Sequence, residues 1–129
     1  MECLVVINEY SKDGDAFATL YKEDCGNPEY AGAELKYIID NYPQDMPYMT
    51  CDVLCEELKQ HNYTDDYDLS EMYCDEDEID ENEIQPYKYV YIIDITQNNI
   101  KYRCKRINAI NFPSLEELKN YETIDTQTF

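Results

Sequence analysis

The sequence predicts an α+β fold: a four-stranded, mainly antiparallel sheet built from two β-hairpins, with about three helices packed on one face. A strand–turn–strand–helix order occurs twice, at residues 2–42 and 87–122. The chain has 129 residues, of which 43% are hydrophobic, and this is enough for a hydrophobic core. We therefore expect one domain over residues 1–129, with an acidic insertion at 64–85 between the second helix and the C-terminal hairpin.

The first predicted hairpin comprises residues 2–22. Residues 2–10 run from apolar to polar, as in a strand that is buried over most of its length. Residues 11–15 predict a turn in which Gly14 takes a positive φ, because glycine has no Cβ to oppose that conformation. Residues 16–22 then predict the return strand.

Two helices are expected after this hairpin. Asn27 and Pro28 suit the N-cap and the first position of a helix that ends at Pro43. Thr50 is the expected N-cap of the second helix, which fades near Asn62. The apolar residues at helical spacing are Leu35, Ile38, Ile39 and Tyr42 in the first helix and Cys51, Leu54, Cys55 and Leu58 in the second.

The C-terminal part predicts a second hairpin and a third helix. Residues 87–95 are rich in tyrosine and β-branched residues, residues 97–99 suit a turn, and residues 100–107 alternate as a return strand. Ser114 and Glu117 have the spacing of a capping box, so a helix is expected there, with Leu115, Leu118 and Tyr121 towards the core. We expect residues 124–129 to fray.

The most unusual feature is a dense run of carboxylates. No lysine or arginine occurs between Lys59 and Lys88, so nothing within this stretch balances its carboxylates. The whole chain carries a net charge of −19. Such a run repels itself, so it stays solvated or meets a basic partner. We call residues 65–83 the acidic run; its eleven carboxylates are Asp65, Asp66, Asp68, Glu71, Asp75, Glu76, Asp77, Glu78, Asp80, Glu81 and Glu83.

The acidic run predicts a protein-binding surface. Tyr63, Tyr67 and Tyr73 lie in or beside it, and tyrosine is a favoured interface residue, whereas disordered acidic tracts usually lack aromatics. The predicted partner is a basic protein that handles nucleic acid, bound by polyanion mimicry. The net charge argues against direct binding to nucleic acid or to an anionic membrane. The alternative for the run is a disordered, solvated insertion.

Two segments resemble small phage and prophage proteins. The segment from Leu20 to Gly32, with its Tyr21-Lys22 pair and its Gly26-Asn27-Pro28-Glu29 helix start, is similar to their strand end and helix start, and residues 89–95 are similar to their C-terminal strand. Here Cys25 is inserted between Asp24 and Gly26. The resemblance implies a phage or mobile-element origin, in which small acidic proteins often inhibit host defence, such as a CRISPR effector, nuclease or restriction subunit.

A second hypothesis concerns the basic strand. Lys101, Arg103, Lys105 and Arg106 hold four of the ten positive charges, and they suit phosphates of a nucleotide signal whose base would stack on Tyr89, Tyr91 or Tyr102. Alternatively, this strand is the internal counter-charge of the acidic run. A third hypothesis, an immunity protein against a basic toxin nuclease, shares the physics of polyanion mimicry.

Catalysis and metal binding are not expected, and no cofactor is predicted. His61 is the only histidine, and Cys51 and Cys55 coincide with an apolar helical stripe, so no zinc set or activated nucleophile is indicated. An EF-hand starting at Asp75 would need glycine at Asp80 and glutamate at Pro86. No secretory signal or membrane span is visible, and six cysteines are then most simply cytosolic thiols, so we expect the cytoplasm of a bacterial host cell.

Overall fold

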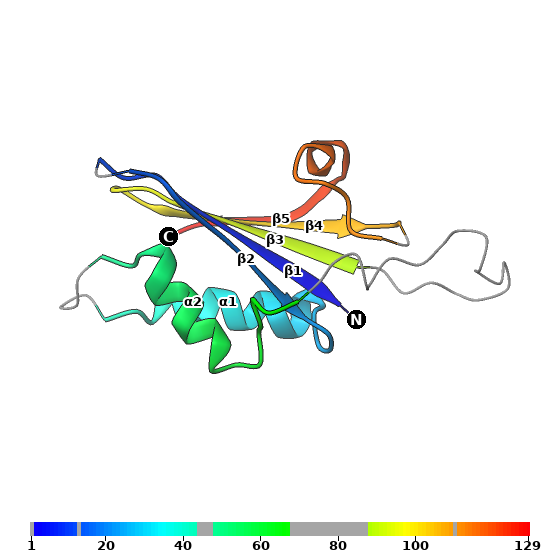
Figure 1. Cartoon of the computed structure of the whole chain (residues 1–129), viewed down its shortest axis with the longest axis horizontal. Coiled ribbons are helices and arrows are strands. Elements are labelled where there is room, and N and C mark those ends of the chain that lie inside the picture. Colours follow the sequence, from blue (N-terminus) through cyan, green and yellow to red (C-terminus); the bar gives the residue numbers. More distant parts are fainter. Residues whose placement is uncertain (1, 13, 44–47, 68–87, 110) are drawn as a thin grey trace, which may run out of the picture.

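The protein is a single twisted sheet with α-helices on one face and a short 3₁₀ turn on the other (Figure 1). The computed structural model describes residues 2–12, 14–43, 48–67, 88–109 and 111–129. The strand order across the sheet is β2-β1-β3-β4-β5. In chain order the strands are β1 (Cys3–Glu9), β2 (Ala16–Lys22), β3 (Lys88–Ile95), β4 (Ile100–Ile107) and β5 (Thr123–Thr128).

The predicted four-stranded, mainly antiparallel sheet is wrong, because the sheet has five strands and is mixed. The two hairpins, β1–β2 and β3–β4, meet through a parallel pairing of β1 with β3, in which Cys3 aligns with Tyr89. A parallel pair needs a long crossover, and the segment that carries both α-helices supplies it.

The fifth strand is formed by residues that we expected to fray. β5 pairs antiparallel with β4, and the Phe129 amide donates to the Ile100 carbonyl at 2.8 Å. Its residues are mostly exposed, so no alternation of apolar side chains marks it in the sequence. The hydrogen bonds available at the edge of β4 fix this segment.

Two α-helices cover one face of the sheet, which we call the helix face (Figure 1). They are α1 (Ala33–Asp40), preceded by a turn of π-helix, η1 (Pro28–Gly32), and α2 (Cys51–Lys59). The Thr50 hydroxyl accepts a hydrogen bond from the Val53 amide, as its predicted N-cap role requires. The Asn27 side chain makes no such cap; instead its carbonyl accepts from the Ala31 amide.

The expected third α-helix is absent from the described part of the chain, and its place is taken by a four-residue 3₁₀ turn, η3 (Glu117–Asn120). The Ser114 and Glu117 side chains do hydrogen-bond each other, at 2.9 Å. The segment lies on the opposite side of the sheet from α1 and α2, which we call the η3 face, where Leu118 is buried but Leu115 is half-exposed (Figure 1). The prediction of about three helices on one face is therefore wrong: two α-helices share one face, and the segment expected to form the third lies on the other as a short turn.

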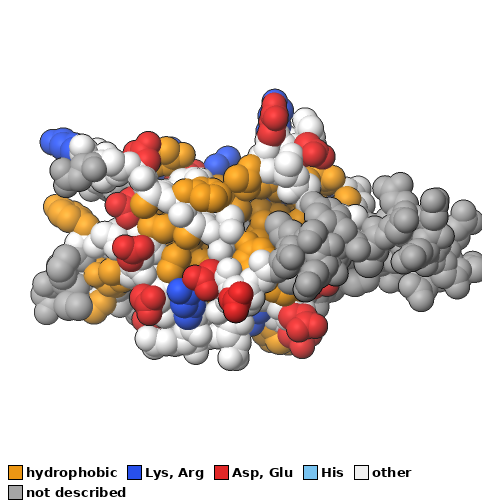
Figure 2. Space-filling view, in the orientation of Figure 1, with side chains coloured by type: hydrophobic (Ala, Val, Ile, Leu, Met, Phe, Trp, Pro, Cys, Tyr) orange, Lys and Arg blue, Asp and Glu red, His pale blue; other side chains and the backbone are white. Residues whose placement is uncertain are grey.

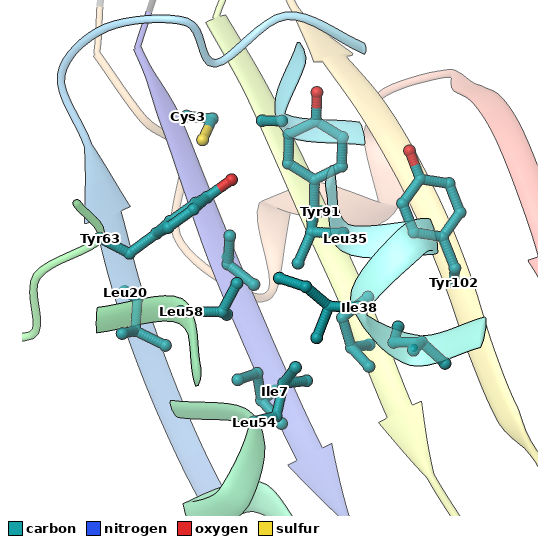
Figure 3. Close-up of a cluster of buried hydrophobic side chains, with 14 of the residues drawn as sticks. Cys3, Ile7, Leu20, Leu35, Ile38, Leu54, Leu58, Tyr63, Tyr91 and Tyr102 are labelled. Carbon is teal, nitrogen blue, oxygen red and sulfur yellow. The ribbon is translucent and has the colours of Figure 1, made fainter. Parts of the chain in front are cut away.

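Each face of the sheet has its own hydrophobic core. On the helix face, side chains of β1 and β3 pack against α1 and α2, with Tyr91 and Tyr102 side by side and their hydroxyls pointing the same way (Figure 3). On the η3 face, Val6, Ile92 and Phe112 pack with Leu118. Among the described residues, no helix is long and apolar enough to cross a membrane.

Candidate functional site

Both ends of the acidic run are attached at the same end of the sheet. Thr64 forms an isolated bridge with Tyr21 at the end of β2, with backbone N–O distances of 2.8 and 2.9 Å. Lys88 opens β3, and its ammonium pairs with the Glu2 carboxylate at 2.8 Å. Because the end of β2 and the start of β3 both flank the start of β1, the chain leaves and re-enters the sheet at one place.

The described part of this end of the sheet is also acidic. The Glu23 and Asp24 side chains follow β2, and Gly26 lies against the backbone of Glu2 and Cys3, which brings Glu29 to the same end. Tyr30, 60% exposed, follows Glu29. We call the exposed carboxylates of this end the acidic rim; they are Glu23, Asp24, Glu29, Asp65 and Asp66.

Four of the predicted partner-binding residues are described. Tyr63 is buried in the helix-face core, with the Lys22 ammonium 4.6 Å from its ring centroid, so it is a core residue. Tyr67 is half-buried, and its ring centroid lies 5.6 Å from that of Tyr21. The other two are Asp65 and Asp66 of the acidic rim.

The remaining predicted contact residues lie outside the described residues. They are Asp68, Glu71, Tyr73, Asp75, Glu76, Asp77, Glu78, Asp80, Glu81 and Glu83. The structure therefore gives the attachment points of the acidic run and the surface around them.

Most basic side chains of the folded body are already paired. All ten lysines and arginines are described, and six of them have a carboxylate within 4.0 Å. The hydrogen bond from Lys59 holds the pKa of the Asp65 carboxyl below its usual value. The pairs are Lys22–Glu34, Lys36–Asp125, Lys59–Asp65, Lys88–Glu2, Arg103–Asp94 and Arg106–Glu122.

The basic residues of β4 do not form one patch. Arg103 and Lys105 point to the η3 face, whereas Arg106, next in the chain, lies on the helix side beside Glu122 at 3.9 Å. Lys101 is exposed near the β3–β4 turn. The strand therefore splits the predicted anion-binding set between two faces.

Arg103 is held by a polar cluster on the η3 face. Its guanidinium donates to one oxygen of Asp94 at 3.0 Å, and the Asn8 amide donates to the other at 2.9 Å. Asp94 belongs to β3 and not to the acidic run; most of that run lies outside the described residues, so the role of the basic strand as its counter-charge stays a prediction.

A groove of about 360 Å³ lies on the η3 face, between the sheet and the η3 segment. Its apolar lining includes Val6, Ile92 and the half-exposed ring of Phe17. Its polar lining consists of Asn8, Arg103, Lys105 and Lys119. Sequence reasoning missed Lys119, because it lies in a mixed-charge segment and reaches the groove only when η3 folds onto the sheet.

Lys105 is an unusual member of this lining because it is a buried lysine, 7% exposed. Its ammonium donates to the Tyr121 carbonyl at 3.0 Å, and no carboxylate among the described residues pairs with it. Burial, followed by the positive charge of Arg103, lowers the pKa of Lys105. The Tyr121 carbonyl satisfies one of the three donors of this ammonium, and the side chain lines the groove.

A larger hollow, of about 620 Å³, lies at the other end of the sheet. It is lined by Tyr42 and Tyr48 of the helix layer, by the β3–β4 turn and by Phe129. Among the described residues that line it, Asp40 is the only one with a charged side chain. The lining includes Pro43 and Tyr48, which flank residues 44–47 in the sequence; those four residues are outside the described residues.

The residues considered for metal binding or nucleophilic attack are His61, Cys51 and Cys55. His61 lies beside Glu34 at 3.2 Å, and the described residues include no group of three ligands that could hold a metal ion. Burial raises the pKa of the Cys51 thiol to about 12, which opposes the thiolate form that metal binding or nucleophilic attack needs.

No family model matches the chain, and no curated protein and no solved structure matches it either.

Proposed function

We propose that this protein binds a basic protein whose own ligand is a nucleic acid, and that the acidic run occupies the positions of phosphates in that partner. The observation that carries the proposal is the end of the sheet where the run is attached. There the exposed carboxylates of the acidic rim follow the end of β2 and the Thr64 bridge, and the two nearby lysines, Lys22 and Lys88, are paired with Glu34 and Glu2.

Charge pairing in the body supports this proposal. Six of the ten lysines and arginines already have a carboxylate within 4.0 Å among the described residues, so few positive charges of the body remain to offset the net charge of −19. A surface with such an excess of negative charge attracts a basic partner over a distance of about 10 Å at moderate salt.

Exposed aromatic side chains add contact area beside this charge. Tyr30 lies at the acidic end, and Tyr37 on α1 is 69% exposed. Tyrosine offers a large apolar body with a polar tip, which suits the buried centre of an interface. Figure 2 shows carboxylates and hydrophobic side chains interspersed over one face of the body, with few basic side chains between them.

The partner class follows from charge alone, because the comparisons add nothing to the resemblance to phage proteins. A defence nuclease and a toxin nuclease both satisfy it. An inhibitor and an immunity protein would act through the same contacts.

The test is co-purification of the tagged protein with proteins of a bacterial lysate at low and high salt. Wild type is compared with a variant in which Asp75, Glu76, Asp77 and Glu78 are changed to the corresponding amides. The control variant makes the same change at four exposed carboxylates that belong neither to the acidic run nor to the acidic rim: Asp15, Asp40, Asp52 and Glu116.

We expect a basic nucleic-acid-binding protein that is retained by wild type and by the control, is released as salt rises, and is weakened in the acidic-run variant. Equal loss in both variants would assign the effect to net charge and contradict a role for the acidic run. Retention unchanged in the acidic-run variant would contradict it as well.

A further inference from the structure

We infer that the groove on the η3 face binds a phosphate monoester carried on an aromatic or heterocyclic body. This is a second binding activity, separate from the acidic end of the sheet. It is carried by the convergence of Arg103, Lys105 and Lys119 on one groove of a chain whose net charge is −19.

The charge of the groove suits a dianion. Arg103, Lys105 and Lys119 supply three positive charges, and Asp94, which holds Arg103, supplies one negative charge. The local sum is therefore about +2, which matches a phosphate monoester above its second pKa of about 6. The exposed carboxylates of the η3 segment, Glu116 and Glu117, are not part of the lining.

The donors needed for such an anion are present and partly unused. The Arg103 guanidinium gives one hydrogen bond to Asp94 and retains further N–H groups. The Lys105 ammonium gives one to the Tyr121 carbonyl and retains two. Because Asp94 and Tyr121 hold both groups in place, an anion would find them already oriented, which lowers the entropy lost on binding.

Burial of Lys105 is the feature that points to a ligand. A lysine that extends into solvent needs no counter-charge. Lys105, by contrast, is 7% exposed and has no carboxylate partner among the described residues. An anion in the groove would pair with the Lys105 ammonium, whose stem is buried and whose charged end lines the groove. The negative charges elsewhere are screened over about 8–10 Å at ordinary ionic strength, so they oppose binding only weakly.

The apolar lining fits the body of the ligand. Val6 and Ile92 belong to the sheet under the groove, and the Phe17 ring, 55% exposed, is available for stacking. The volume of about 360 Å³ lies near the lower end of the range of small-molecule pockets, about 300–1,000 Å³. The groove therefore fits a single ring with one phosphate better than a dinucleotide.

The test is calorimetric titration of the full chain with phenyl phosphate, inorganic phosphate and benzoate. We expect saturable binding of phenyl phosphate, and weaker binding of the other two, because inorganic phosphate lacks the ring and benzoate lacks the second charge. Failure of phenyl phosphate to bind, or equal binding of benzoate or inorganic phosphate, would overturn the inference.

Three variants locate the site. Lys105→Met and Lys119→Gln should each raise the dissociation constant of phenyl phosphate, about tenfold for Lys105, since a hydrogen bond to a charged group contributes about 1.5 kcal/mol or more. Lys12→Gln is the matched control for Lys119→Gln, because both lysines are exposed and have no carboxylate partner among the described residues.

If Lys12→Gln weakens binding of phenyl phosphate as much as Lys119→Gln does, the effect is one of net charge and the groove is excluded as the binding site. Lys119 is exposed, so its substitution tests the site even if Lys105→Met fails to fold. Amide substitution within the acidic run should leave this binding unchanged, which separates failure of this inference from failure of the proposed function.

Discussion

The phenol of Tyr91 donates a hydrogen bond to the carbonyl of Gly26 at 2.7 Å, and the bond is buried. It ties β3 to the segment between β2 and η1, where Gly26 lies so close to Cys3 that an added Cβ would be 2.7 Å from the Cys3 amide nitrogen. Cys25, the residue inserted before this glycine, takes the left-handed conformation at φ 58°. The bond therefore fixes the corner that leads into the helical layer.

Tyr91→Phe should lower the free energy of unfolding by about 1–2 kcal/mol, because it leaves a buried carbonyl without its donor. Tyr102→Phe is the matched control. The Tyr102 ring packs against Tyr91, and its buried hydroxyl has no nitrogen or oxygen partner among the described residues. That substitution should be neutral or stabilising. Urea unfolding of both variants checks this; an equal loss in both would contradict the role given to the Gly26 bond.

Stability should fall in alkaline solution. Burial raises the pKa of the Cys3, Cys51 and Cys104 thiols to about 12 in the folded protein, above the ordinary thiol value of 9.0. Between these values the unfolded chain loses protons that the folded protein keeps, so the free energy of unfolding decreases as pH rises. The slope approaches about 1.4 kcal/mol per pH unit for each thiol.

Urea unfolding at pH 8, 9 and 10 measures this slope. Below about pH 8 these thiols contribute no pH dependence, because they are protonated in both states. Cys104→Ala should make the decline shallower, whatever its effect on stability at neutral pH. An unchanged slope in this variant would show that the Cys104 thiol ionises equally in both states.

Thiol accessibility distinguishes Cys25 from the buried cysteines. Cys25 is exposed, whereas Cys3, Cys51 and Cys104 are buried with raised pKa values. When thiols are titrated with an aromatic disulfide reagent at neutral pH, the Cys25→Ser variant should show one fast-reacting thiol fewer than wild type. The same count under denaturing conditions is the control for total thiol. An unchanged fast phase would contradict the exposure of Cys25.

The amides of β5 should be protected from hydrogen exchange. The Phe129 amide donates to the Ile100 carbonyl, and β5 forms a ladder with β4. Backbone exchange followed by nuclear magnetic resonance would show slower exchange for Phe129 than for an unstructured chain. Exchange of Phe129 at the rate of an unstructured chain would contradict the pairing of β5 with β4 and would support the frayed C-terminus expected from the sequence.

The sequence predicted the helices and strands that are specified by their own residues rather than by contacts with distant segments. The runs of β-branched and aromatic residues in β1 and β3 and the hydroxyl of Thr50 before α2 carried their own signals, and these elements are confirmed. β5 has no such signal, because its exposed threonines are ordered by the edge of β4 rather than by burial. The parallel pairing of β1 with β3, which joins the two hairpins, likewise depends on contacts between segments far apart in the sequence.

The candidate sites were predictable to different extents. The alternation of β4 correctly placed Arg103 and Lys105 on one face, but the role of Lys119 depends on where the η3 segment folds. Tyr63 was assigned to the partner surface because acidic residues follow it; the left-handed turn at Asn62, φ 70°, precedes its entry into the core. The partner class of the acidic run stays a prediction.

The most direct test of the central claim is competition with nucleic acid. The basic protein recovered by co-purification is loaded with a fluorescently labelled DNA or RNA duplex, and displacement of the duplex is followed by anisotropy as this chain is added. The account predicts displacement by wild type and none by a variant in which every aspartate and glutamate of residues 75–83 is an amide. Displacement by that variant at the wild-type concentration, or simultaneous binding of both ligands, would contradict polyanion mimicry.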